Sequence, residues 1–187
     1  MKSYLDQELA FYGVFEPMVA LIKISCITAI LIFSPWMAFR LSQAMRAVFG
    51  FTLLFSSVLF VISMLLFVVG VLFCFFITLP FGINFLLQFG SDAVRPVIGV
   101  GKFVNFSGFF LLGFGMIFEL PLVMVLLTRV GLLKPAFFQK NRRYAILVVA
   151  ILAAVITPTP DAFNMSLMGI PLYLLYETGI FFAKRLS

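Results

Sequence analysis

Glu119 is the residue of this chain best placed to do chemistry, because it is an acid inside an apolar run. The run extends from Phe114 to Val123 and holds no other charged residue. A carboxylate in hydrocarbon is costly, so such acids usually face a bundle interior or a wet cavity. Glu119 could bind a substrate or a partner helix, carry a proton, or pair structurally inside the bundle. Pro121, two residues later, removes a backbone donor and predicts a kink beside the acid.

Three further charged residues stand at or near the ends of apolar segments. Glu16 begins the first segment, where an acid either complements a helix dipole or binds a partner. Lys23 lies about two turns further along, and we expect it to snorkel outward or to pair with Glu16. Glu177 lies near the end of the last segment and could pair with Lys184, with Arg185 or with a cation of a partner.

The residue types needed for several kinds of active site are absent from the sequence. There is no histidine, so a histidine acid–base catalyst and the usual zinc site are excluded. Cys26 and Cys74 both lie in apolar segments and are interpreted as small hydrophobic residues. No glycine-rich nucleotide loop is present either. We therefore expect no enzyme activity, no cofactor and no metal, and any energy must come from a partner or from the membrane potential.

Composition identifies the element type that must position these residues. Of 187 residues, 64% are hydrophobic and 11% are charged, with a mean hydropathy of +1.20. This predicts an all-α, polytopic membrane helical bundle forming a single domain over residues 1–187. About five transmembrane helices are expected, over residues 17–39, 51–79, 106–127, 145–157 and 163–176, the last extending to either 176 or 182. The last two are short, since 13 residues of helix span about 20 Å against a hydrocarbon core of about 30 Å.

The basic residues predict how these helices are oriented. They gather after the first, third and fifth segments, which lie on one side of the membrane if every segment crosses: Arg40, Arg46, Arg129, Lys134, Lys140, Arg142, Arg143, Lys184 and Arg185. Cytoplasmic loops carry such an excess, which places the C-terminus inside and the N-terminus outside. The net charge of +6 is thus explained by topology, and no nucleic-acid partner is expected. Residues 80–105 contain too many Gly and Pro to span and are expected either to lie along the outer interface or to cap the bundle.

Four motifs in order resemble one known family. They are Phe-Gly-Met-Ile-Phe-Glu-Leu-Pro at 114–121, Asn-Arg-Arg-Tyr-Ala-Ile at 141–146, Thr-Pro-Thr-Pro-Asp at 157–161 and Ile-Pro-Leu-Tyr-Leu-Leu-Tyr-Glu at 170–177. Their order and spacing, over about residues 108–179, resemble the TatC subunit of the twin-arginine protein translocase. Upstream, Glu16 with Pro17, Lys23, and Pro35 after Ser34 resemble the same family more weakly.

This resemblance implies a receptor and core subunit of the translocase in the bacterial cytoplasmic membrane. Such subunits recognise folded precursors with twin-arginine signal peptides and assemble with single-span TatA and TatB subunits, driven by the proton-motive force. Membrane lipid and further copies of the chain are possible partners. The resemblance and the charge pattern together assign partner or substrate binding to Glu16, Lys23, Glu119, Pro121, Asp161 and Glu177. They assign structural roles to Pro35, Arg142, Arg143, Thr157, Pro158, Pro160, Pro171 and Tyr176.

The chain also departs from the family pattern. It has no counterpart of the family's cytoplasmic His-Leu-x-Glu-Leu-Arg segment and first helix, so we expect a truncated or diverged member. Residues 40–50 contain no acid, and Glu177 is the only carboxylate near the cytoplasmic side. Because paired arginines are best held by carboxylates, we expect weak signal-peptide binding. Two alternatives remain: a small transporter or channel with Glu119 as the ion or proton site, and an inert remnant that merely inserts.

Overall fold

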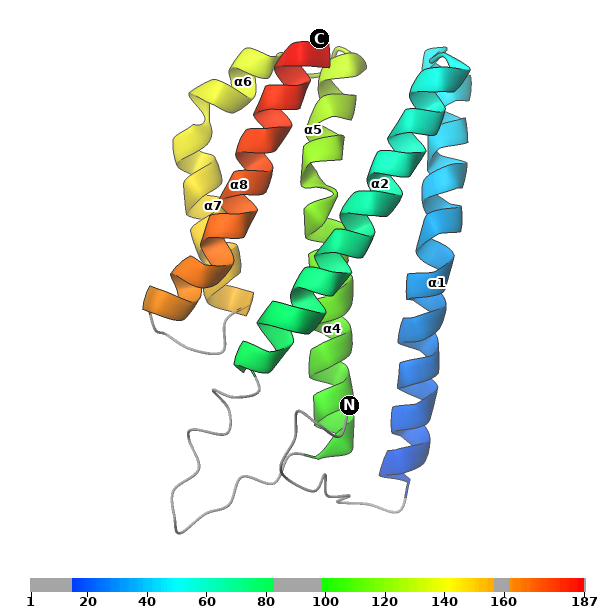
Figure 1. Ribbon diagram of the computed structural model, residues 1–187, viewed down its shortest axis with the longest axis vertical. Coiled ribbons are helices and arrows are strands. Elements are labelled where there is room, and N and C mark those ends of the chain that lie inside the picture. The colour runs from blue at the N-terminus through cyan, green and yellow to red at the C-terminus, as the bar shows by residue number, and fades with distance from the viewer. Residues whose placement is uncertain (1–14, 83–98, 157–161, 187) are drawn as a thin grey trace.

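The computed structural model describes residues 15–82, 99–156 and 162–186, and within these ranges the chain is built from helices without a β-strand. Figure 1 shows the helices side by side, with α1 (Glu16–Phe49) at one edge and α7 (Arg142–Ile156) and α8 (Ala162–Leu186) at the other. Three stretches are long and apolar enough to cross a membrane: Pro17–Phe49, Leu53–Gly82 and Val100–Arg129. The predicted all-α membrane bundle is confirmed.

The first helix is longer than the sequence predicted. We expected it to end at residue 39, with Arg40 and Arg46 in a loop, but α1 continues to Phe49 and carries both arginines. The helix passes Pro35 because the Ser34 hydroxyl donates to the Leu31 carbonyl at 2.8 Å, which replaces the donor that a proline lacks. It ends at Gly50, whose φ of 66° is a left-handed conformation that favours glycine.

The second helix contains a local π-turn. α2 (Leu53–Phe73) runs into η1 (Cys74–Thr78), and the N–H of Leu79 bonds to the carbonyl of Cys74, five residues earlier. Pro80 follows directly and has no N–H of its own to continue the regular ladder. Helical backbone continues to Gly82, close to the predicted end at residue 79.

The third predicted span is one rod interrupted at a single residue. α4 (Val100–Phe118) ends and α5 (Leu120–Arg129) begins on either side of Glu119. The Glu119 N–H bonds to the Met116 carbonyl at 3.1 Å in a tightened turn, and the Glu119 carbonyl accepts from Val123 at 3.0 Å as the helix resumes. A break in the regular helix therefore lies two residues before Pro121, beside the position where the sequence predicted a kink. The rod begins at residue 100 rather than 106, so part of the segment predicted to lie along the outer interface is helical.

The C-terminal part forms a helical hairpin preceded by a short helix that the sequence did not predict, α6 (Pro135–Lys140). α7 has 15 residues and is short, as expected. α8 has 25 residues and ends at Leu186, four residues past the further of the two predicted ends, 176 and 182. Pro171 is accommodated within this helix. The motif residues Thr157, Pro158, Pro160 and Asp161 lie outside the described residues.

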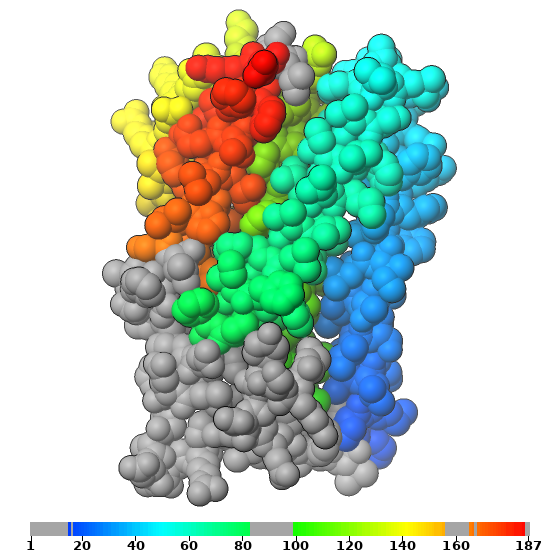
Figure 2. Space-filling view, viewed as in Figure 1, coloured from blue at the N-terminus to red at the C-terminus, as the bar shows by residue number. Residues whose placement is uncertain are grey.

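Aromatic side chains and glycines bring the helices together. A cluster around Phe114, which is 1% exposed, joins α2 and η1 to α4. A Cβ added at Gly70 would lie 2.8 Å from the Phe114 carbonyl oxygen, so α2 and α4 approach as closely as their backbones allow. A second cluster of Met124, Phe138, Tyr176 and Ile180 joins α5 and α6 to α8. Figure 2 shows α2 running diagonally across one face of the molecule, between α8 and α1.

The basic segments share one end of the bundle. Figure 1 shows the α1–α2 connection, the end of α5, α6 and the C-terminus all at that end. This is the arrangement expected if all three basic stretches lie on the same side of the membrane. We refer to it as the basic end.

Candidate functional site

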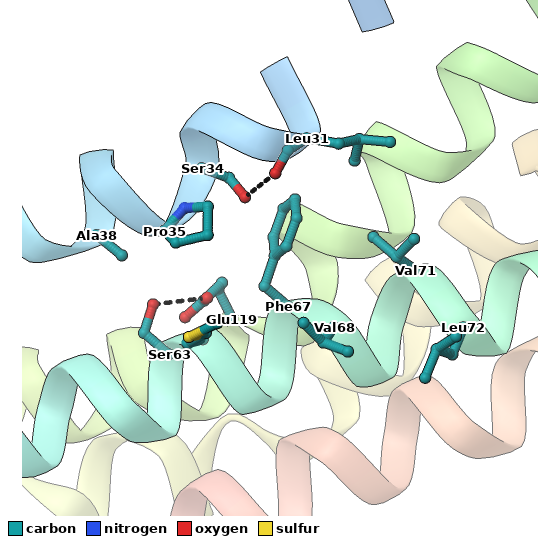
Figure 3. A pocket seen from close by; sticks show the side chains of 11 residues that line it. Leu31, Ser34, Pro35, Ala38, Ser63, Phe67, Val68, Val71, Leu72 and Glu119 are labelled. Atoms are coloured by element: carbon teal, nitrogen blue, oxygen red, sulfur yellow. Dashed lines mark hydrogen bonds between the residues drawn. The ribbon is translucent and has the colours of Figure 1, made fainter. Parts of the chain in front are cut away.

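The Glu119 carboxyl group is held by a serine of the neighbouring helix. The Ser63 hydroxyl, on α2, donates to Glu119 Oε1 at 2.8 Å (Figure 3). Ser63 is 8% exposed, whereas Glu119 is half-buried. The bond joins α2 to the break between α4 and α5. One carboxylate oxygen is thereby fixed, and Ser63 is the hydrogen-bonding partner of this acid among the described residues.

Glu119 borders a cavity of about 180 Å³ between α1 and α2. Side chains of α2 such as Phe67 and Val68 form one wall, and Leu31 and Pro35 of α1 belong to the other (Figure 3). Apart from Glu119, Ser63 and one serine of α1, the lining is apolar. A group that enters this cavity would therefore meet a hydrocarbon-like surface with one acid at its edge.

Sequence and local structure explain why this wall of α1 is polar at one point only. Pro35 leaves the Leu31 carbonyl without a backbone donor, and the Ser34 hydroxyl supplies one. Leu31, Ser34 and Pro35 all line the cavity. The carbonyl that a proline would expose is thus already occupied, which leaves the carboxyl of Glu119 as the main polar feature of the cavity.

The geometry limits what this site can do chemically. The cavity lining contains no basic residue and no second acid. Within the described parts of the chain, no group of three or more His, Cys, Asp or Glu could hold a metal ion. A proton or ion relay needs a further titratable group close by, whereas a hydrogen bond to a donor on another helix needs only the carboxyl. The arrangement favours binding to a helix over ion transfer.

A second polar cluster lies near the basic end. Arg142 Nη2 and Glu177 Oε2 form an ion pair at 2.8 Å, and the Tyr173 hydroxyl donates to Glu177 Oε1 at 2.8 Å. The structure thus pairs Glu177 with Arg142 and not with the predicted Lys184 or Arg185. Those residues lie seven and eight positions further along α8, which is about 10–12 Å of helix rise.

The remaining predicted residues have structural surroundings or lie outside the description. Tyr176 is buried, and its hydroxyl donates to the Phe138 carbonyl at 2.7 Å, which fixes α6 to α8. Pro121 is buried where α5 meets α8, and a Cβ at Gly179 would lie 3.1 Å from its Cα. Lys23 is half-exposed on α1, and the side chain of Glu16, its expected partner, lies outside the described part.

Sequence reasoning missed Ser63 and the role of Ser34. Both are polar residues in apolar segments, and Ser34 stands directly before a proline. These two signals were visible in the sequence. That Ser63 faces Glu119 depends on how α2 is rotated against α4, which the sequence does not contain.

Comparison with known proteins identifies what the chain is similar to. The family model for TatC, described as Sec-independent protein translocase protein, matches residues 1–171. A TatC from Carboxydothermus hydrogenoformans is 39% identical over 188 residues, with 96% of this chain and 74% of the relative covered. A TatC from Aquifex aeolicus is 34% identical, covering 98% and 77%.

Solved structures give the same result. A crystal structure described as the twin arginine translocase receptor TatC in DDM has a TM-score of 0.80 and 34% identity, covering 96% of this chain and 80% of the other. A second crystal structure of that receptor has a TM-score of 0.79, covering 99% and 82%.

Proposed function

The chain belongs to the TatC family of Sec-independent protein translocase proteins, and on this premise we propose that Glu119 receives the membrane helix of a translocase partner. The chain is a multi-pass membrane component of that translocase. The partner we propose is a single-span subunit of the TatA or TatB type. In the same proposal, the complex exports folded proteins across the bacterial cytoplasmic membrane, driven by the proton-motive force.

A single observation carries this proposal: a half-buried carboxyl group, fixed by one hydrogen bond, borders an apolar cavity inside a membrane span. Ser63 occupies Oε1, so Oε2 is available to a donor on an incoming helix. Hydrogen bonds between membrane helices contribute about 1–2 kcal/mol in model peptides. A hydroxyl, amide or protonated acid in the partner's span would serve as that donor, and the rest of the contact would be apolar packing.

The alternative of a small transporter receives less support. Transporter sites usually combine polar groups from several broken helices near the midplane. Glu119 does lie at a break, but the other polar groups lining its cavity are two serine hydroxyls. Ser34 is already bonded to its own helix and Ser63 to the acid. Family membership therefore decides in favour of the translocase.

Recognition of twin-arginine signal peptides is the second part of the proposal. Guanidinium groups bind best to carboxylates through charge-assisted, bidentate bonds. Among the described residues at the basic end, the one carboxylate is Glu177, and Arg142 already engages it. We therefore propose that this chain by itself binds such a peptide weakly, with other acids of the assembled complex supplying the affinity.

Orientation follows from the same charges. The described basic end carries nine Lys and Arg residues and one acid, so we propose that it faces the cytoplasm. A cysteine placed at Leu132, which is exposed in the α5–α6 connection, should then be labelled by a membrane-impermeant maleimide only after the membrane is opened. This assay should use a background in which Cys26 and Cys74 are replaced by serine and alanine. Labelling of intact cells would contradict the orientation.

The proposed contact is tested by cross-linking. A photo-reactive residue at Val68, which lines the cavity and is exposed, should capture the single-span partner in membranes. The same probe at Val155, exposed on α7 far from the cavity, serves as the control position. Equal capture from both positions, or none from Val68 in a complex that still exports a folded reporter, would refute the contact.

A further inference from the structure

A second cavity of about 570 Å³ lies between α7 and α8. Its walls are apolar apart from Ser166 and Tyr173, and they include Ile146, Val149 and Ala150 of α7 and Met165, Gly169 and Ile170 of α8. α7 packs mainly against α8 and lies at the edge of the bundle (Figure 1). We call this cavity the hairpin groove. It is independent of the Glu119 cavity, which lies between α1 and α2.

The hairpin groove leads up to positively charged residues. On α7, Arg142 and Arg143 lie one helical turn before Ile146, and Lys140 precedes them at the end of α6. Side chains of a helix lean toward its N-terminus, so both arginines lean from the groove toward the basic end. Glu177 balances one of these charges through its ion pair with Arg142. The rim therefore keeps a net positive charge, and Lys140 and Arg143 are both exposed.

The wall of the groove is physically tied to this rim. Tyr173 lines the groove, and its hydroxyl donates to Glu177, which in turn binds Arg142. Tyr144, in the first turn of α7, is 56% exposed, and the guanidinium of Arg143 lies over its ring, 5.3 Å from the ring centroid. Tyrosines and basic residues at one level are typical of the boundary between lipid headgroups and acyl chains.

The dimensions match one membrane leaflet. From Arg142 to Ala150 the helix rises about 12 Å, since each residue contributes about 1.5 Å. Half of the hydrocarbon core is about 15 Å. A transmembrane helix of a partner would need a surface along the whole core, whereas a single acyl chain needs only this depth. The cationic rim requires an anion at the headgroup level, and basic pockets between membrane helices are known to bind such headgroups.

We propose that the hairpin groove binds an anionic phospholipid, with one acyl chain between α7 and α8 and the phosphate held by Arg143 and Lys140. The ion pair of Arg142 with Glu177 and the Tyr173–Glu177 hydrogen bond hold the wall of the groove next to this rim. The site would fix the hairpin in one leaflet of the membrane.

The test is native mass spectrometry of the purified full chain with phosphatidylglycerol or phosphatidylcholine of identical acyl chains. The parent chain should retain phosphatidylglycerol at least fivefold more than phosphatidylcholine. Replacing Lys140 and Arg143 together by glutamine should abolish this preference. The matched control replaces Lys184 and Arg185 by glutamine and should keep the preference. These two residues carry the same charge at the same end, but they lie 11 and 12 residues beyond Tyr173, the last groove residue of α8, whereas Arg143 lies three residues before Ile146 of the groove.

A groove-filling change separates chain binding from simple charge attraction. Gly169→Leu should lower retention of both lipids, because the larger side chain fills the groove while the charges stay in place. The helix should tolerate this change, since an added Cβ meets Ala153 and Val149 only at ordinary contact distances of 3.8 and 3.9 Å. Circular dichroism checks that the variant remains helical, and the double glutamine variant gives the test independently of this one. The proposal is overturned if the Lys184 and Arg185 control loses the preference for phosphatidylglycerol to the same extent. It is also overturned if the Lys140 and Arg143 variant keeps that preference. Capture of a protein in membranes by a photo-reactive residue at Ile146 of the groove, with no phosphatidylglycerol preference in the purified chain, would assign the groove to a protein and overturns the proposal too.

Discussion

Replacing Glu119 by alanine should weaken the association of a partner helix without preventing insertion or folding. The change removes the one carboxyl group at the cavity and frees the Ser63 hydroxyl, whose bond to it measures 2.8 Å. Loss of one hydrogen bond between membrane helices corresponds to about 1–2 kcal/mol, which is roughly a 5- to 30-fold change in an equilibrium constant. Insertion should be unaffected, because removing an acid from a membrane span lowers the cost of inserting it.

Two further variants divide the effect into charge and geometry. Glu119→Gln keeps an oxygen that can accept from Ser63 and adds a donor, so it should retain part of the association. Ser63→Ala leaves the acid but removes its tether, and should weaken association less than Glu119→Ala does. Ser56→Ala is the matched control, because Ser56 is a buried serine of the same helix whose hydroxyl binds the Ser42 carbonyl at 3.0 Å, away from the cavity.

The assay is the yield of the photo-cross-link from Val68 to the single-span partner, measured in membranes and normalised to the amount of inserted chain. Export of a folded reporter is followed in the same cells. If Glu119→Ala and Ser56→Ala give equal yields and equal export, the carboxyl group has no role in partner binding. If the yield falls only because less chain is inserted, the residue is structural and the reasoning above is wrong.

Three other changes test the packing around the two polar sites. Gly70→Ala should reduce the free energy of unfolding by about 1–3 kcal/mol, seen as a lower melting temperature in detergent, because its Cβ would meet backbone at 2.8 Å. Gly113→Ala is the control and should melt like the parent chain, because a Cβ there meets nothing within 4 Å. Tyr176→Phe should cost about 1 kcal/mol through loss of its 2.7 Å bond to α6, seen as faster proteolysis of that helix; unchanged cleavage would contradict the tether. Arg142→Gln should reduce the free energy of unfolding by at most about 1 kcal/mol, because the Arg142 and Glu177 side chains are 50% and 29% exposed. A larger loss of stability in thermal melting would mean that the pair does more than hold the hairpin.

The sequence predicted those parts of the fold that depend on composition and on local chemistry. Apolar segments gave the membrane helices in their correct order, and Pro121 gave the break at Glu119, since a missing backbone donor acts within its own turn. Helix ends were less predictable. α1 passes Pro35 because a neighbouring serine replaces the lost donor, and α8 likewise accommodates Pro171, so a proline alone did not mark a boundary.

The partners of the charged groups could not be predicted in the same way. Ser63 lies 56 residues from Glu119 in the sequence, and Arg142 lies 35 residues from Glu177. Each pair forms because two helices pack at a particular rotation and height, which depends on many side chains elsewhere. Sequence proximity suggested Lys184 and Arg185 for Glu177, but seven and eight residues of helix carry them out of its reach.

The surroundings of the Glu119 cavity explain why a side chain, and not the backbone, would be recognised there. Pro35 on the cavity wall and Pro121, two residues after Glu119, each remove a backbone donor. On α1 the freed carbonyl is covered by the Ser34 hydroxyl, and before α5 the chain tightens so that the Glu119 N–H reaches Met116. The carbonyl that Pro35 leaves on the cavity wall of α1 is thus satisfied locally, whereas the acid has one oxygen bonded and one to offer. An unsatisfied polar atom is expensive in hydrocarbon, so a donor brought by a second helix gains more at this carboxyl than anywhere else on the cavity wall.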